Sequence, residues 1–177
     1  MFVLVTTTSS PLLTGFTFHV VAIFGEAGLG RSVALAVFFP AAIVSVLITP
    51  LVNIASDYMQ LKYFAVAHGI ALGFFMLCLP LLPQGASMYV ALIVSKGLAT
   101  AMFGVNQTVV WPRFFGLTHL GAITGFATAW FVGGSAVGPY IYSLSLQLTG
   151  SFLWVSYIFA PLCIVLGLLG LRADNPN

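Results

Sequence analysis

Long apolar segments joined by short linkers are the feature that most restricts the fold of this chain. A helix needs about 20 apolar residues to cross the hydrocarbon core of a bilayer. Segments of that length lie near residues 2–24, 32–54, 63–82, 87–111, 118–143 and 152–171. The sequence therefore predicts an all-α membrane protein with six transmembrane helices, with the lipid bilayer as its main surroundings.

Charged side chains are too few to cover the surface of a water-soluble domain. Only 5% of the residues are charged and 60% are hydrophobic, whereas an ordinary soluble domain has roughly 25% charged residues. The basic residues are scattered along the chain, and nucleic-acid binding needs them gathered in one patch. These counts exclude a soluble fold, and we expect no nucleic-acid partner.

The linkers between the segments are short, so consecutive helices are expected to run antiparallel in a single domain that covers residues 1–177. An even number of spans places both termini on one side of the membrane. Lys62, Arg113 and Arg172 fall on that side, whereas Arg31 on the other side is offset by Glu26. Because basic residues favour the cytoplasmic side, we expect both termini in the cytoplasm.

Polar side chains recur at helical spacing in four of the six segments. They are Thr7, Ser10, Thr14 and Thr17 in the first, Ser45, Thr49, Asn53 and Ser56 in the second, Lys96, Thr100 and Gln107 in the fourth, and Thr124, Thr128 and Ser135 in the fifth. A helix that faces only lipid has no use for such groups. The third and sixth segments are therefore predicted to be peripheral. Two polar helices and then one apolar helix, twice over, indicate an inverted repeat of three plus three helices.

Serine and threonine also bond to carbonyl groups of their own helix, so for any single hydroxyl a purely structural role stays open. Small residues recur every fourth position in the fifth segment, at Gly121, Gly125, Ala129 and Gly133. This stripe predicts close approach of a neighbouring helix. Farther along, Gly133, Gly134 and Pro139 weaken the helix, and we expect a kink or gating hinge there.

Lys96 is the residue most costly to place in a membrane, because it lies about nine residues into its segment, near the bilayer midplane. An ammonium group there costs at least ~2.5 kcal/mol. The acidic residues Glu26, Asp57 and Asp174 all lie outside the six segments. We interpret Lys96 as an anion-binding residue; the alternative is a lysine that extends along its helix toward the interface. A substrate is expected near Thr14, Ser45, Lys96, Thr100, Gln107 and Trp130.

The linker after the second segment carries Asp57 and, five residues later, Lys62. A carboxylate and a basic residue at adjoining helix ends can form a latch that breaks between states. The alternative is an ordinary solvated loop. Cys78 and Cys163 both lie in apolar segments and are read as buried thiols. We expect no metal site and, without a nucleotide-binding motif, no cofactor.

Three stretches, NIASDYMQLK, WPRFFGLTHLGAITG and GSAVGPYIYSLSLQLTGS, together resemble the C-terminal six-helix half of a major facilitator superfamily transporter. TFHVVAIFGEAGLGRSVA is similar to the first helix of that half and the loop after it. The pattern is nearest to bacterial oxalate/formate antiporters and monocarboxylate carriers. The resemblance implies a bacterial inner-membrane protein that moves a small solute, such as an organic anion, by alternating access.

Transporters of this superfamily bind substrate between two six-helix halves, so the resemblance also implies a second half as partner, either a separate chain or a second copy. The first segment begins directly after Met1, and this favours a truncated, non-transporting fragment as the alternative. A remote alternative is an intramembrane serine protease built on Ser135 and His68, because six spans with such a pair resemble rhomboid proteases. We expect no enzymatic activity.

Overall fold

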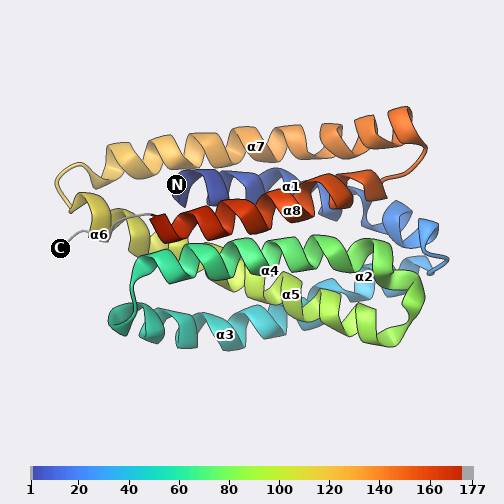
Figure 1. Ribbon diagram of the computed structural model, residues 1–177, viewed down its shortest axis with the longest axis horizontal. Helices are drawn as coiled ribbons and strands as arrows, with labels where there is room; N and C mark the ends of the chain where they lie inside the picture. The colour runs from blue at the N-terminus through green and yellow to red at the C-terminus, as the bar shows by residue number, and fades with distance from the viewer. Residues whose placement is uncertain (1, 173–177) are drawn as a thin grey trace.

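The computed structural model describes residues 2–172 and shows a bundle built from helices alone in that range (Figure 1). Its six long helices are α1 (Phe2–Glu26), α3 (Phe38–Tyr58), α4 (Leu61–Leu81), α5 (Ala86–Val105), α7 (Leu120–Thr149) and α8 (Leu153–Leu169). Short elements join or extend them: α2 (Arg31–Ala36), η1 (Leu82–Gln84), η2 (Asn106–Val110), α6 (Trp111–Phe115) and η3 (Gly170–Arg172). The predicted all-helical architecture is confirmed.

Within residues 2–172, five helical segments are long and apolar enough to cross a membrane. They are Arg31–Tyr58, Leu61–Gln84, Ala86–Phe115, Leu120–Thr149 and Leu153–Arg172. The helix α1 is 25 residues long but is not among them; its first half contains the polar run TTTSSP, which lowers its hydropathy. Long apolar helices of this kind are compatible with a membrane protein.

The helix boundaries depart from the predicted spans chiefly at three places. The second span is divided into α2 and α3 and ends at Tyr58 instead of residue 54. The fourth span continues beyond residue 111 through η2 and α6 to Phe115. The fifth runs without interruption to Thr149, past Pro139, so the glycine-rich segment forms no break in the helix.

Three helix pairs make up the bundle: α1 packs on α7, α3 on α5, and α4 on α8, and α4 also packs on α5. Glycines allow the close approach in each pair. A β-carbon added at Gly69 of α4 would lie 2.5 Å from Cα of Gly167 in α8. One at Gly97 of α5 would lie 2.6 Å from Cβ of Val44 in α3. Figure 1 shows α4 and α8 side by side, with α7 and α3 at opposite edges.

The prediction that the small-residue stripe of the fifth segment packs against a neighbouring helix is wrong for the described residues. A β-carbon at Gly121, Gly125 or Gly133 would meet no atom within 4 Å. Instead Gly134 and Gly138 face Pro11 of α1. The helix α7 is rotated so that this second set of small residues meets α1, because the bulky Tyr142 is then buried against Gly15.

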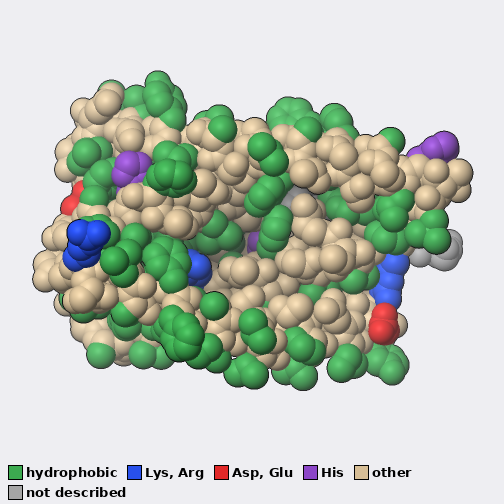
Figure 2. All heavy atoms as spheres, turned by 180° about the vertical axis from the view of Figure 1, so that it is seen from behind, with side chains coloured by type: hydrophobic (Ala, Val, Ile, Leu, Met, Phe, Trp, Pro, Cys, Tyr) green, Lys and Arg blue, Asp and Glu red, His purple; other side chains and the backbone are tan. Residues whose placement is uncertain are grey.

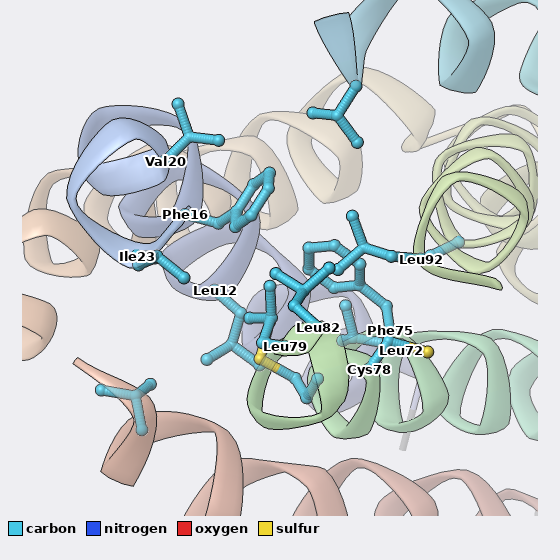
Figure 3. Packing of buried hydrophobic residues seen from close by; sticks show 14 of the residues in the cluster. Leu12, Phe16, Val20, Ile23, Leu72, Phe75, Cys78, Leu79, Leu82 and Leu92 are labelled. Atoms are coloured by element: carbon cyan, nitrogen blue, oxygen red, sulfur yellow. The ribbon is translucent and has the colours of Figure 1, made fainter. Parts of the chain in front are cut away.

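The main core lies where α1, α4 and α5 meet (Figure 3). Leu12 and Phe16 of α1 point toward Leu79 and Phe75 of α4. The rings of Phe16 and Phe75 meet edge to face, with centroids 5.0 Å apart. These side chains hold the centre of the bundle together by apolar packing.

The expectation that the third span is peripheral is wrong for α4, which is the most enclosed of the five candidate spans. In the most apolar stretch of the span that contains α4, 61% of the residues are buried, whereas the share for α7 is 6%. An apolar surface suits a protein interior as well as lipid, so composition alone did not separate the two. The helices α3 and α7 are the exposed ones.

Candidate functional site

Lys96 lies on α5 near its crossing with α3. Its side chain is half-buried, and Nζ lies 5.0 Å from the ring centroid of Phe38. Within residues 2–172 the only ion pair joins two other residues, Asp57 and Arg113, so no described carboxylate neutralises this ammonium group. A cation over an aromatic face gains about 0.5–2 kcal/mol. The contact with Phe38 positions the ammonium group without neutralising its charge.

Ser45 is half-buried on α3. It follows Val44, which packs against Gly97, the residue after Lys96, so Ser45 and Lys96 lie near the same helix crossing. Thr100, one turn from Lys96, is exposed, and its Oγ1 donates a hydrogen bond of 2.9 Å to the carbonyl oxygen of Lys96. Thr14 is half-buried on α1. The Thr100 contact is the ordinary bond of a hydroxyl to its own helix, so the structural role left open above applies to it.

The face of the bundle turned away from the viewer in Figure 1 is hollowed near its centre, between hydrophobic side chains (Figure 2). The few charged groups are scattered over this face, and most lie near the two ends (Figure 2). A wall that is mostly apolar, with few charged groups, suits a small solute held by one or two polar contacts.

Trp130 lies in a different place from Lys96. It lines a groove of about 520 Å³ bounded by α1, α7 and α8, together with Pro11, Phe126 and Leu162. No residue of α3 or α5 lines that groove. The structure therefore does not bring Trp130 together with Lys96 and Ser45.

Gln107 lies in η2, a π-helical turn between α5 and α6. Its Oε1 accepts a hydrogen bond of 3.2 Å from Nε1 of Trp111. The amide therefore steadies the helix in which it lies, and one of the two lone pairs of its oxygen is used for this bond.

Asp57 pairs with a basic residue, but that residue is Arg113 and not Lys62 as predicted. Oδ1 of Asp57 lies 2.7 Å from Nη2 of Arg113, and Nη1 of the same guanidinium donates to the carbonyl oxygen of Ser56. Nζ of Lys62 instead lies 5.6 Å from the ring centroid of Tyr63. The forked guanidinium can bond the side chain and the helix end together, which a lysine so near in sequence cannot do. The contact ties the end of α3 to α6.

The gating residues predicted in α7 lie in an unbroken helix. Gly134 packs on Pro11 of α1, whereas Gly133 faces no neighbour within the described chain. The carbonyl oxygen of Pro139 accepts a hydrogen bond of 3.2 Å from Nε2 of His19. This bond adds a polar contact to the packing of α1 on α7.

The sequence reasoning missed a buried polar network. Oγ of Ser9 lies 2.9 Å from Nε2 of His68, and Nδ2 of Asn106 lies 3.0 Å from Nδ1 of the same ring. All three side chains are buried. A signal for it was present: His68 is the one histidine of an otherwise apolar segment, and a buried polar group needs partners.

The protease alternative is not supported by the positions of its two residues. Both ring nitrogens of His68 have partners in other helices, and Oγ of Ser135 donates to the carbonyl oxygen of Val132 in its own helix. The structure does not bring Ser135 and His68 together.

Glu26 is a second residue whose role the sequence did not reveal. Its Oε1 accepts a hydrogen bond of 2.9 Å from the backbone N–H of Phe152, and its Oε2 accepts one of 2.7 Å from Oγ of Ser151. The carboxylate thus caps the start of α8, where the helix dipole favours negative charge. It joins α1 to α8 at that end of the bundle.

The described part of the chain is a helical bundle with three polar features: Lys96, which has no described carboxylate as a partner, the pair of Asp57 and Arg113, and the buried network around His68. Comparison of the chain with family models, with curated proteins and with solved structures gives no match in any of the three.

Proposed function

We propose that this chain is a secondary-active membrane transporter, or half of one, that moves a small organic anion by alternating access. The observation that carries the proposal is Lys96, a half-buried lysine within a candidate span. No carboxylate of residues 2–172 pairs with it. The cost of keeping such a cation in a membrane is offset when a bound anion supplies the missing negative charge.

Three of the four main helix pairings support an inverted repeat of the major facilitator superfamily type. If the first three spans are exchanged with the last three, the pair of α1 with α7 maps onto that of α5 with α3, and the pair of α4 with α8 maps onto itself. The pair of α4 with α5 departs from this symmetry, because its counterpart, α8 with α1, is a much smaller contact. Inverted repeats of this kind are common in transporters, where the two repeats move against each other.

The exposed apolar surfaces of α3 and α7 are consistent with a second six-helix half as partner. Large apolar side chains cover the outer surfaces of α3 and α7, among them Phe39, which is 76% exposed, and Phe126, which is 62% exposed. Lipid covers such surfaces in a membrane, and a second six-helix half covers them equally well. We propose such a half, as a separate chain or a second copy, in a bacterial inner membrane with both termini in the cytoplasm.

The clamp of Asp57 and Arg113 supports a moving end of the bundle. The two side chains are 68% and 36% exposed, so the pair breaks at little cost. We propose that it closes one end of the transport path in one state and opens in the other.

Uptake into proteoliposomes tests the proposal. The chain is reconstituted alone and with candidate partner halves, and uptake of radiolabelled oxalate, formate and lactate is measured. Lys96→Ala is expected to lower anion uptake at least tenfold, because the charge that holds the anion is gone, and Lys96→Arg is expected to retain part of it. Arg31→Ala removes the same charge from an exposed linker end and is the matched control.

Two results would contradict the proposal. Unchanged anion uptake in Lys96→Ala refutes the role of the lysine. No uptake of any anion with any partner half supports the alternative of a non-transporting membrane fragment.

A further inference from the structure

Three polar side chains from three different helices meet inside the bundle. Ser9 of α1 and His68 of α4 are both 0% exposed, and Asn106, where α5 passes into η2, is 1% exposed. Ring nitrogens of His68 lie 2.9 Å from Ser9 and 3.0 Å from Asn106. The ring of Phe103 covers the imidazole from the side, with the centroids 6.2 Å apart. Such a network is costly to bury unless its partners are well matched.

One buried polar atom of this network has no hydrogen-bond partner. Nδ2 of Asn106 donates to Nδ1 of His68, whereas Oδ1 of the same amide is buried without a hydrogen-bond partner. In this arrangement Nδ1 is bare, and Nε2–H donates to Oγ of Ser9. The imidazole is neutral, and the amide keeps an unused acceptor beside it.

A half-turn of the Asn106 amide about its Cβ–Cγ bond exchanges Nδ2 and Oδ1. Oδ1 then faces Nδ1 of His68 and accepts a hydrogen bond when that nitrogen carries a proton. Oγ of Ser9 accepts from Nε2–H in this state as before. Both nitrogens of an imidazolium ring are therefore matched by acceptors, without movement of any helix.

Among residues 2–172, no permanently charged side chain bonds to the imidazole of His68. Among the elements that pack on α4, α8 brings Cys163 close to Gly69, and η3 carries the exposed Arg172. His19 of α1 and Lys96 of α5 are each ten residues from the network, about 15 Å along their helices. Neither described carboxylate, Glu26 or Asp57, bonds to His68. The charge at this position is therefore decided by the imidazole itself.

The helix next to the network has a special form. Residues Asn106–Val110 make a π-helical turn, and such turns occur often at functional sites. One extra residue in a turn rotates everything after it by about 100° relative to a continuous α-helix. Asn106 is the first residue of this π-turn, and α6, which carries Arg113, follows the turn directly. The polar network and the clamp of Asp57 and Arg113 therefore involve one continuous helical stretch.

We propose that Ser9, His68 and Asn106 form a binding site for a single proton, and that this proton is the coupling ion of the transporter. The second part rests on the function proposed above. The proton comes from hydronium in water and adds to the lone pair of Nδ1 in His68. The Asn106 amide turns and its Oδ1 accepts the new N–H bond. Release reverses both steps, and no other bond forms or breaks.

Nitrogen NMR of the chain in lipid nanodiscs tests the site without any transport. The histidines are labelled with ¹⁵N, and His68→Gln assigns the signals of His68. From pH 9 to pH 4 we expect its signals to change from one bare and one protonated nitrogen to two protonated nitrogens. Signals that stay those of a neutral ring over this whole range would overturn the proposal.

Two substitutions at Asn106 test the role of the amide, because they are expected to shift the titration midpoint of His68 in opposite directions. Asn106→Leu removes the acceptor and is expected to lower proton affinity at least tenfold, which moves the titration midpoint down by one pH unit or more. Asn106→Asp supplies a negative acceptor and is expected to move it up by at least one unit. Gln107→Leu, in the same π-turn but bonded to Trp111, is the matched control and is expected to leave it unchanged.

These variants also separate a proton site from a merely structural contact. If Asn106→Leu does not fold, Asn106→Asp still decides the question. An unchanged midpoint in whichever variant folds overturns the assignment to Asn106.

Uptake in proteoliposomes tests the coupling separately. Uptake that rises with an imposed proton gradient in the native chain, but not in Asn106→Leu, supports it. If His68 titrates as expected and uptake ignores the gradient, the proton site stands and its coupling role is wrong. If the chain transports nothing while His68 titrates, the proposed function fails and the proton site does not.

Discussion

Replacement of Gly69 by alanine tests the closest crossing in the bundle, between α4 and α8. The new β-carbon would lie 2.5 Å from Cα of Gly167 and 2.6 Å from the carbonyl oxygen of Cys163. Ordinary van der Waals contact begins at 3.4 Å, so the two helices have to separate by about 0.9 Å at this point. Both obstructing atoms belong to the backbone, so no side-chain rotation relieves the contact.

The cost follows from the loss of packing along the whole pair. A gap of about 0.5–1 Å forfeits a quarter to a half of the dispersion energy of each contact it opens. Overpacked sites of this kind lose about 1–3 kcal/mol of folding free energy, and we expect Gly69→Ala to fall at the upper end. Gly125 of α7 is the matched control, because a β-carbon there would meet nothing within 4 Å. Gly125→Ala is expected to stabilise by about 0.4–1 kcal/mol, since alanine is the better helix former.

The measurement is reversible unfolding of the purified chain in mixed micelles, with increasing sodium dodecyl sulfate and helicity followed by circular dichroism. The two variants change the same atoms, so their opposite signs isolate the packing contribution. If Gly69→Ala matched or exceeded the native chain in stability, the close pairing of α4 with α8 would be refuted.

Three further substitutions follow from the hydrogen bonds and the ion pair. Glu26→Ala removes the cap of α8 and is expected to cost about 1 kcal/mol in the same unfolding assay; an unchanged midpoint would argue against the cap. Asp57→Asn breaks an exposed ion pair with Arg113 and is expected to cost less than about 1 kcal/mol while changing the rate of anion uptake. An effect on stability alone would make the clamp structural. Tyr142→Phe removes a buried hydroxyl that donates to the carbonyl oxygen of Leu12 and is expected to cost about 0.5–1.5 kcal/mol, with retained helicity as the check on folding.

Part of the candidate site was accessible from the sequence. Lys96 stands out because a charge within an apolar segment is costly wherever the helix points. The partner of Asp57 was not accessible, because Arg113 lies 56 residues away and reaches it only through the pairing of α3 with α5, the helix that continues through η2 into α6. A reading along the chain favoured the nearer Lys62.

The buried network of Ser9, His68 and Asn106 shows a similar limit. Each residue was visible in an apolar segment, but their meeting depends on how α1, α4 and α5 are rotated against one another. The same rotation decides that Gly138, and not Gly133, contacts α1. Helical periodicity shows which residues share a face; it does not say which face meets a neighbour.

The sequence by itself determined the class of the fold: apolar segments of spanning length, short linkers and few charges admit little besides an antiparallel helical bundle. Only the tertiary structure decided which helices are enclosed. Within this chain α4 is central and α7 is exposed, the reverse of what polarity suggested. In water the hydrophobic effect sorts apolar residues inward, but in lipid both the interior and the surroundings are apolar. Close fit at Gly69, Gly97 and Gly138, and matched hydrogen bonds around His68, then choose the arrangement.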